Sequence, residues 1–404
     1  MQSFDPTRLA RIDDWMRRYV DEGKFPGSTF LLAERGEIVH RASAGYRAVE
    51  AKAPFEEDTI ARIYSMTKPI VSVGLMMLAE RGLFHLDAPV SAFLPEFAEC
   101  RALVPGAATA DDVAPCPPPT LHQLLTHTSG LTYGFNPGLA AAAYAEAKID
   151  FAPDRPGLAE MTRALAALPL AFTPGARWEY SVGIDVIGRV IEVVAGRPLD
   201  EWLRDEILEP LGMKDTGFAI PDAKIGRLAH LYTSLESGSA MSLGAAGRGV
   251  MREVETAEGS AWRGTRTFSG GGGLLSTIDD YFAFTEMLRK GGAHRGARLL
   301  SPATLAFMRR NHLSGDIASM GPKSFAETPM TGIGFGVGGS VVLDPALARA
   351  PGNVGDFSWG GIASTVFWLD PVADLTAIFF TQLTPSSSYP ARSELKALVH
   401  GART

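Results

Sequence analysis

The segment at residues 65–82, SMTKPIVSVGLMMLAERG, opens with a serine and a lysine three residues apart and continues as an apolar helix pattern. Its apolar residues recur at helical spacing until the closing glycine. Residues three apart on a helix share a face, so we expect Lys68 to lie against Ser65. A lysine held there can keep a serine hydroxyl activated, directly or through a third group. The start of the helix also brings backbone N–H groups and a positive dipole end close to the hydroxyl.

The same spacing occurs a second time, at Ser393 and Lys396. A Ser-x-x-Lys pair is therefore weak evidence by itself, because most such pairs belong to a polar helix face. No further motif follows Ser393, and we interpret it as part of the polar face of a terminal helix. The weight given to Ser65 depends on the motifs that accompany it.

Strand patterns lie near both ends of the chain, and helix patterns dominate between them. The strand patterns cover 29–33, 38–42, 338–343, 362–369 and 375–383. Terminal helices are expected at 6–22 and 392–400. These patterns predict an α+β fold, in which an antiparallel sheet flanked by helices is built from residues 1–85 and 269–404. A mostly helical domain with long loops, residues 86–268, would be inserted into it.

The composition excludes several classes of protein. The chain has 404 residues, 46% of them hydrophobic, and a formal net charge of −7, so it is a folded protein with no electrostatic reason to bind nucleic acid or an anionic membrane. Its two cysteines, Cys100 and Cys116, are too few for a disulfide scaffold or a four-thiolate zinc site. No apolar stretch is long enough to cross a membrane, and the first residues lack a secretory signal pattern. We therefore expect a cytoplasmic protein, and the oligomeric state is left open.

Other catalytic patterns are missing from the sequence. There is no HExxH motif, and His122 and His127 lack a third ligand nearby, so no metal is expected. There is no Gly-x-Ser-x-Gly nucleophile elbow and no phosphate-binding loop, so no cofactor is expected either. We expect His127 to be structural rather than catalytic.

Two motifs accompany Ser65 at long range. Residues 178–183 read WEYSVG, where Tyr180 precedes a helix pattern, and residues 357–362 read FSWGGI, where a glycine pair precedes an apolar run. Supporting segments are LLTHTSGL at 124–131, PG at 174–175 and SGGG at 269–272. Together these motifs resemble the serine β-lactamase and penicillin-binding-protein superfamily, over roughly residues 8–400. Within it, the chain is most similar to the β-lactamase-like carboxylesterases called family VIII esterases.

The resemblance implies roles for the motif residues. Ser65 would be the nucleophile, Lys68 would stabilise its alkoxide and relay the proton, and Tyr180 would act as general base and then general acid. A free tyrosine titrates near 10, and a neighbouring ammonium favours its phenolate. The choice between Tyr180 and Lys68 as base stays open, because groups this close titrate together. The backbone N–H groups of Ser65 and Ile362 would form the oxyanion hole.

Five further residues are expected to bind substrate. Trp359 would line the pocket, with Asp185 as a candidate acceptor for its indole N–H. Gly360 and Gly361 would let the substrate approach the strand closely. Tyr133 would face the cleft. Phe135 and Trp262 are either pocket walls or packing residues.

Two departures from the superfamily pattern bear on the substrate. Val182 replaces the usual asparagine of the tyrosine motif, and Trp359 replaces the usual lysine or histidine of the strand motif. Trp359 supplies no cation for a substrate carboxylate, so we predict a serine hydrolase for small, short-chain carboxylic esters. The alternatives are a β-lactamase or D-alanyl peptidase, an acyltransferase, and a non-catalytic ligand-binding relative.

Overall fold

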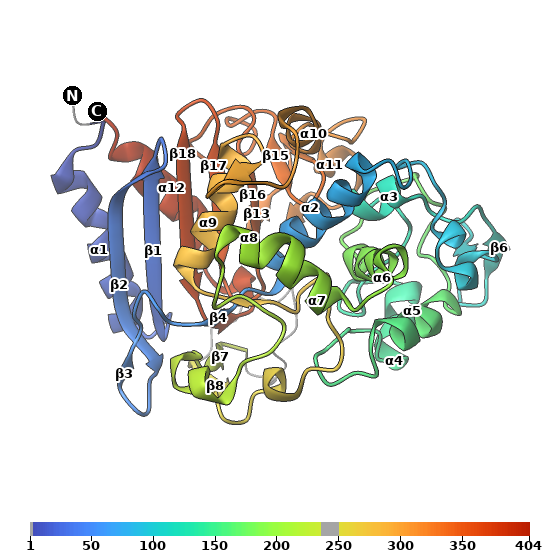
Figure 1. Ribbon diagram of the computed structural model, residues 1–404, viewed down its shortest axis with the longest axis horizontal. Coiled ribbons are helices and arrows are strands. Elements are labelled where there is room, and N and C mark those ends of the chain that lie inside the picture. The colour runs from blue at the N-terminus through green and yellow to red at the C-terminus, as the bar shows by residue number, and fades with distance from the viewer. Residues whose placement is uncertain (1–2, 236–249) are drawn as a thin grey trace.

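The computed structural model describes residues 3–235 and 250–404 (Figure 1). Within them, the largest sheet is antiparallel and has eight strands in the order β14-β15-β16-β17-β18-β1-β2-β3. The strands are β1 (Gly27–Glu34), β2 (Glu37–Ala48), β3 (Ala53–Pro54), β14 (Ile333–Phe335), β15 (Ser340–Val342), β16 (Phe357–Gly360), β17 (Val366–Asp370) and β18 (Leu375–Thr381). Strand β1 pairs with β18, so the sheet is built from both ends of the chain, as the sequence predicts.

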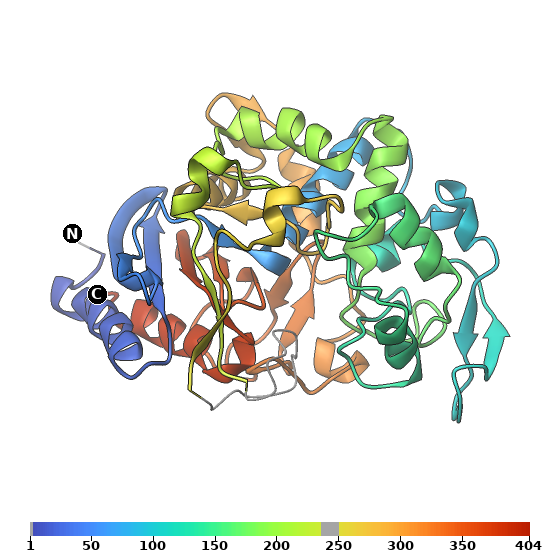
Figure 2. The same cartoon turned by 90° about the horizontal axis from the view of Figure 1, so that it is seen from below.

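Each face of this sheet buries a different set of side chains, because successive residues of a strand point to opposite faces. On the outer face, residues such as Phe30 and Phe379 pack against α1 (Pro6–Asp21) and α12 (Ala391–Gly401). On the inner face, residues such as Leu31 and Ile378 pack against α2 (Thr67–Glu80) and α9 (Ile278–Arg289). Both views show α1 and α12 side by side at the edge of the molecule (Figures 1 and 2). Helix α2 is buried along nearly its whole length, which explains its apolar sequence.

The helices of the middle of the chain are α3 (Leu121–Leu125), α4 (Leu139–Glu146), α5 (Leu158–Ala166), α6 (Gly183–Ala195), α7 (Leu199–Leu203) and α8 (Glu209–Leu211). Helices α3 to α6 lie toward the end of the molecule opposite α1, whereas α7 and α8 run back toward its middle (Figures 1 and 2). Two short helices, α10 (Pro302–Met308) and α11 (Ile317–Met320), follow α9. Helix α6 packs against α2 through its apolar face, which joins the helical part to the helix that follows Ser65.

Several short strands lie outside the large sheet. They are β4 (Ala61–Arg62) with β9 (Leu275–Ser276), β5 (Arg101–Leu103) with β6 (Val113–Pro115), β10 (Ala293–His294) with β11 (Ala297–Arg298), β12 (Ser324–Phe325) with β13 (Thr328–Pro329), and β7 (Leu231–Thr233) between β8 (Arg252–Glu255) and β19 (Leu383–Thr384). The expected helical segment, 86–268, therefore contains strands, and β7 pairs with β19 from the C-terminal part of the chain. Residues 236–249 of that segment lie outside the described residues, and the boundaries at 86 and 268 stay predictions.

The strand expected at 362–369 begins later than predicted. Strand β16 ends at Gly360, a turn occupies the next five residues, and β17 begins at Val366. The turn is closed by the Gly361 amide, which donates to the Thr365 carbonyl at 2.9 Å. The apolar residues at 362 and 363 are buried in this turn rather than in a strand, which is why hydrophobicity alone placed the boundary wrongly.

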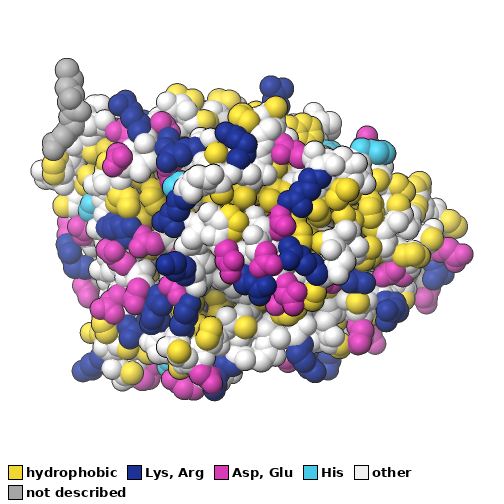
Figure 3. Space-filling view, in the orientation of Figure 1, with side chains coloured by type: hydrophobic (Ala, Val, Ile, Leu, Met, Phe, Trp, Pro, Cys, Tyr) yellow, Lys and Arg dark blue, Asp and Glu magenta, His cyan; other side chains and the backbone are white. Residues whose placement is uncertain are grey.

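The surface carries charges of both signs. On the face drawn in Figure 3, Lys and Arg side chains alternate with Asp and Glu side chains, without a region of one sign. Among the described residues, no helix is long and apolar enough to cross a membrane.

The terminal helices are joined by one carboxylate of the second Ser-x-x-Lys segment. Glu394 accepts hydrogen bonds from the Trp15 indole at 2.6 Å and from the Tyr19 hydroxyl at 2.8 Å. In the same segment, the Lys396 ammonium donates to Asp356 at 3.0 Å. The second motif thus connects α12 to its neighbours, in agreement with its interpretation as a helix face.

We predict that Glu394→Ala lowers the free energy of unfolding by about 2 kcal/mol, because it leaves two buried donors without an acceptor. Urea unfolding measures this loss. Glu394→Gln is the matched control and should retain most of the stability, since its amide oxygen still accepts. Equal stabilities of wild type and Glu394→Ala would contradict this role.

Candidate active site

Ser65 lies in the single turn of 3-10 helix, η1 (Tyr64–Met66), that leads from β4 into α2. Tyr64, immediately before it, has a φ of 43°, in the left-handed region that non-glycine residues rarely adopt. The Ile63 amide donates to the Leu274 carbonyl at 3.2 Å, and the Tyr281 hydroxyl donates to the Met66 carbonyl at 3.0 Å. The surrounding chain therefore fixes this strained turn on both sides of Ser65, which holds its hydroxyl at the start of α2.

Lys68 is 1% exposed, and its ammonium is surrounded by oxygen atoms. Its Nζ donates to Ser65 Oγ at 3.2 Å, to the Tyr133 hydroxyl at 2.9 Å and to the Gly271 carbonyl at 2.7 Å. An ammonium has three N–H donors, so each donor has its own acceptor. The expected contact between Lys68 and Ser65 is present, and Tyr133 contacts Lys68.

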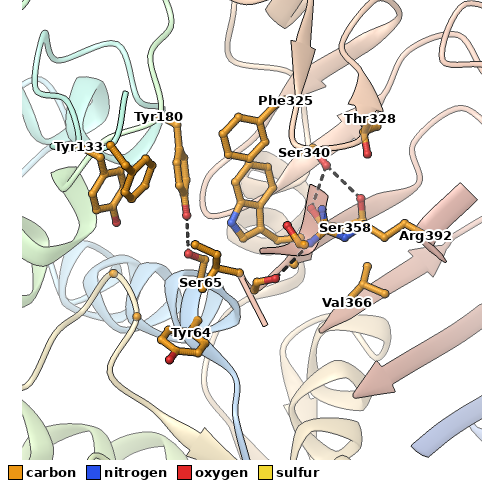
Figure 4. A pocket seen from close by; sticks show the side chains of 18 of the residues that line it. Tyr64, Ser65, Tyr133, Tyr180, Phe325, Thr328, Ser340, Ser358, Val366 and Arg392 are labelled. Carbon is orange, nitrogen blue, oxygen red and sulfur yellow. Dashed lines mark hydrogen bonds between the residues drawn. The ribbon is translucent and has the colours of Figure 1, made fainter. Parts of the chain in front are cut away.

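Tyr180 reaches Ser65 from the helical part of the molecule. Its hydroxyl lies 2.5 Å from Ser65 Oγ (Figure 4). The Tyr180 carbonyl accepts from the Asn136 side chain at 2.8 Å, and Tyr180 stands just before α6. The Lys68 Nζ also lies 4.6 Å from the centre of the Tyr180 ring, close enough for a cation–π contact. Ser65, Lys68 and Tyr180, which are far apart in the sequence, thus form one cluster.

Asp185 is buried behind this cluster and does not meet Trp359. Its Oδ1 accepts from the Ser269 hydroxyl at 2.5 Å and from the Gly271 amide at 2.9 Å. Burial raises the pKa of the Asp185 carboxyl, and the charge of Lys68 opposes that rise. The Trp359 indole N–H has no acceptor in the described part of the chain, so the predicted Trp359–Asp185 hydrogen bond is wrong. Asp185 follows Tyr180 by little more than one helical turn and therefore lies near the site, but it contacts Gly271 rather than Trp359.

Gly360, Gly361 and Ile362 lie at the end of β16. There, Gly361 packs against Ile63, two residues before Ser65. A Cβ on Gly361 would lie 2.4 Å from the Ile63 carbonyl oxygen, so only glycine lets this turn approach η1. This packing is one reason for the glycine, and the close approach of substrate expected from the sequence stays a prediction. No backbone acceptor for the Ile362 amide occurs in residues 3–235 and 250–404. That N–H is therefore available to a ligand beside Ser65.

Aromatic rings form the walls around the cluster. The Trp359 ring stacks on Phe325 with centroids 5.8 Å apart, and it lies 5.5 Å from the Tyr180 ring. Phe135 stacks on Tyr133 at 4.6 Å, and the Trp262 indole donates to the Gly273 carbonyl at 2.7 Å. Phe135 and Trp262, whose roles the sequence left open, both line the cavity and both pack against neighbours.

One cavity of about 520 Å³ is lined by most of the residues described above. The predicted residues among its walls are Ser65, Tyr133, Tyr180, Asp185, Trp359, Gly360, Gly361 and Ile362. Lys68 lies beneath this surface. A volume of this size fits a drug-sized small molecule. Two groups of possible metal ligands, Glu50/His230/Glu253 and Asp356/Asp370/His400, occur in the described residues, and neither includes a member of the Ser65 cluster.

His127 contacts the residues on both sides of Tyr180. Its Nδ1 lies 3.0 Å from the Ser181 hydroxyl and accepts the Ser181 amide at 3.3 Å, and its carbonyl accepts the Glu179 amide at 2.9 Å. Its ring packs 4.9 Å from the Tyr180 ring. Burial, and then the charge of Lys68, hold the pKa of His127 well below its ordinary value. A neutral His127 therefore positions the segment that carries Tyr180.

Some residues of the site were not predicted from the sequence. Gly271 supplies a backbone acceptor to Lys68 and a backbone donor to Asp185. The glycine run at 270–273 was the only signal, and it did not reveal which peptide group mattered. Phe325 and Arg392 also line the cavity, but they lie in segments without a recognisable motif.

The fold and the serine–lysine–tyrosine cluster define a class of serine-dependent enzymes, and comparison with known proteins identifies the family. Residues 12–401 match the family model described as Beta-lactamase, so the chain belongs to the β-lactamase family. It is 34% identical over 397 residues to Esterase EstB of Burkholderia gladioli, covering 94% of this chain and 93% of that esterase. It is 30% identical to the Lovastatin esterase of Penicillium rubens over 91% of each chain.

A solved structure extends the comparison to three dimensions. EstCE1, described as a hydrolase with promiscuous acyltransferase activity, superposes with a TM-score of 0.80 at 30% identity. The match covers 97% of this chain and 98% of EstCE1. The β-lactamase/transpeptidase-like fold predicted from the sequence is thereby confirmed.

We predict that His127 makes the folded protein less stable in acid. An unfolded histidine binds a proton below about pH 6.5, whereas the buried His127 stays neutral, so its contribution to stability is present above that pH and is lost as the pH falls through it. The difference in unfolding free energy between wild type and His127→Asn should therefore shrink by about 1 kcal/mol from about pH 7.5 to about pH 5.5.

Asparagine is the replacement of choice, because the φ of residue 127 is 56° and asparagine tolerates that region. Urea unfolding at the two pH values measures both free energies. A difference that is the same at both values would mean that His127 gains a proton in the folded state.

Proposed function

We propose that the protein is a carboxylesterase that works through an acyl-enzyme on Ser65. The observation that carries this proposal is the position of Ser65 Oγ, 2.5 Å from the Tyr180 hydroxyl and 3.2 Å from Lys68 Nζ. A hydroxyl within hydrogen-bond reach of two proton-transfer groups is the arrangement required of an activated nucleophile. The similarity to Esterase EstB supports ester hydrolysis as the reaction.

The contacts of Lys68 support a division of labour between the two groups. With all three N–H donors engaged, Lys68 acts as an ammonium that stabilises negative charge on Ser65 and Tyr180. Tyr180 then takes the proton of the Ser65 hydroxyl as the oxygen attacks the ester carbonyl. It returns this proton to the leaving alcohol. In the second half of the reaction, water attacks the acyl-enzyme and gives a proton to Tyr180. Tyr180 passes this proton to Ser65 Oγ as the acid leaves.

The oxyanion of each tetrahedral intermediate would lie between the amides of Ser65 and Ile362. Such a donor contributes about 3 kcal/mol to transition-state stabilisation. The close approach of the Gly361 turn to Ile63 supports this pairing, because Ser65 and Ile362 both line the cavity. This inference depends on the same packing that requires glycine at position 361.

The charges around the cavity favour an uncharged ester over a β-lactam or a D-alanyl peptide. Those alternatives carry a carboxylate, and Trp359 offers no cation for it. Arg392 lines the cavity, but its guanidinium lies 3.3 Å from Glu327 and is already paired. We therefore retain the esterase assignment, in the family VIII group, with a cytoplasmic location and a small-molecule ester as the partner.

Acyl transfer is the second candidate, because an acyl-enzyme can be resolved by an alcohol as well as by water. The description of EstCE1 as a hydrolase with promiscuous acyltransferase activity favours it. The ratio of ester to acid formed in the presence of a competing alcohol, such as methanol, distinguishes transfer from hydrolysis.

We predict that Ser65→Ala lowers kcat/KM for p-nitrophenyl butyrate by at least about a thousandfold, because the nucleophile is removed. Release of p-nitrophenol measures the rate, and nitrocefin in parallel measures β-lactam hydrolysis, which should be far slower than ester hydrolysis in the wild type. Ser314→Ala, at an exposed serine outside the cavity, is the matched control and should retain the wild-type rate on this ester. Full activity of Ser65→Ala would overturn the proposed function.

A further inference from the structure

The cavity does not end at Ser65 but continues around the end of β16 to the outer face of the sheet. Phe357 and Trp359 point to the inner face, where they join the core beneath α2, so Ser358 and Gly360 point to the outer face. Ser358 is paired with Ser340 on one side and with Trp368 on the other. All of these outer-face residues line the same cavity as Ser65.

Figure 4 shows this extension, with Ser340, Ser358, Val366 and Arg392 on the side of β16 away from Tyr180. Helix α12 covers it with Arg392 and Lys396, which also line the cavity. We call this part of the cavity the far chamber, defined by Ser340, Ser358, Val366, Trp368, Arg392 and Lys396.

Gly360 stands at the passage between Ser65 and the far chamber. It pairs with Val366 on β17, and a Cβ at Gly360 would lie 2.5 Å from Arg392 Nη2. Arg392 also donates to the Gly361 carbonyl at 3.2 Å. A side chain at position 360 would therefore collide with Arg392 and with the Thr365 carbonyl oxygen, 2.7 Å away, so glycine lets Arg392 lie against the end of β16.

The charges of the far chamber cancel in pairs. Arg392 lies 3.3 Å from Glu327, and Lys396 lies 3.0 Å from Asp356. The carboxylates of both pairs are buried, with side-chain exposures of 7% for Glu327 and 0% for Asp356. A ligand with a net charge would break one of these pairs and leave a buried partner unpaired, which is strongly unfavourable.

Three N–H donors along the cavity lack an acceptor. Within the described residues, no acceptor is found for the indole N–H of Trp359, the indole N–H of Trp368 or the Nε of Arg392. A buried donor that is left unsatisfied destabilises the folded chain, so an acceptor supplied by a ligand would be favourable. The far chamber also contributes the hydroxyls of Ser340 and Ser358, whereas Val366 is apolar. The walls thus offer apolar contact together with N–H donors that have no acceptor of their own.

We propose that the far chamber binds one limb of the ester substrate, and that this limb is elongated, uncharged and largely apolar with ether, carbonyl or similar oxygen acceptors. The proposal rests on the proposed esterase function and deepens it, because it names a substrate class beyond short-chain esters. The reacting carbonyl stays at Ser65, while the limb passes Gly360 and reaches the surface between β16 and α12. A cavity of about 520 Å³ is larger than a short-chain ester needs.

Substitution of the chamber floor tests this proposal. Ser358→Phe fills the far chamber from β16, and Val366→Phe fills it from β17. The substrates are p-nitrophenyl acetate, p-nitrophenyl decanoate, and the p-nitrophenyl ester of a chain of similar length that contains three ether oxygens. A fourth substrate, the acetate ester of triethylene glycol monomethyl ether, places the same ether chain on the alcohol side.

We expect the wild type to prefer one of the ether-containing esters to the decanoate by about tenfold or more in kcat/KM. In both variants, kcat/KM for that ester should fall at least tenfold, and that for p-nitrophenyl acetate should stay within twofold of wild type. The limb that shows the loss, acyl or alcohol, is the one that occupies the chamber. Ser314→Phe, at an exposed serine outside the cavity, is the matched control and should leave all four rates unchanged.

Retention of the wild-type rate on every long ester in both variants would overturn the far-chamber proposal, as would equal losses on acetate and on the long esters. In either case, acetate hydrolysis that still depends on Ser65 would leave the esterase function standing. Hydrolysis that survives Ser65→Ala would instead remove the proposed function itself.

Discussion

The buried ammonium of Lys68 is the constraint on which the site depends. A charge removed from water costs several kcal/mol unless hydrogen bonds compensate it. Here the compensating oxygens come from three distant segments, at Ser65, Tyr133 and Gly271. If the helical part moved away from the sheet part, the Lys68 ammonium would either be exposed to water or stay buried without its acceptors. The same three contacts fix the hydroxyl on which we place the chemistry.

The large sheet joins segments from both ends of the chain and so holds β16 close to the segment that contains Ser65 and Lys68. Strand β1 pairs with β18, and the strand that carries Trp359 lies two places from β18 in the same sheet. The Gly361 turn then packs on Ile63, next to Ser65. The turn that contains Gly361 and Ile362 thereby lines the same cavity as Ser65, at the start of α2. The sheet also separates the two parts of the cavity, because alternate residues of β16 face Ser65 and the far chamber.

Much of this arrangement could be predicted from the sequence. Strand patterns at both ends predicted the antiparallel sheet, and the motifs around Ser65 and Tyr180 predicted groups that the structure brings within hydrogen-bond distance. The turn before Val366 could not be seen, because buried turn residues are as apolar as strand residues. The Gly271 carbonyl and the Asp185 contacts could not be seen either, since backbone groups leave no mark on the sequence. The far chamber depends on the contact between Arg392 of α12 and Gly360 of β16, which only the folded chain reveals.

The central claim is that Ser65 becomes acylated by the ester substrate, and the mass of the protein tests it most directly. The enzyme is mixed with p-nitrophenyl butyrate, quenched in acid within milliseconds to seconds, and analysed by intact mass spectrometry and peptide mapping. The account predicts one added butyryl group, located on Ser65 and absent from Ser65→Ala. An adduct on another residue, or one that persists in Ser65→Ala, would contradict it.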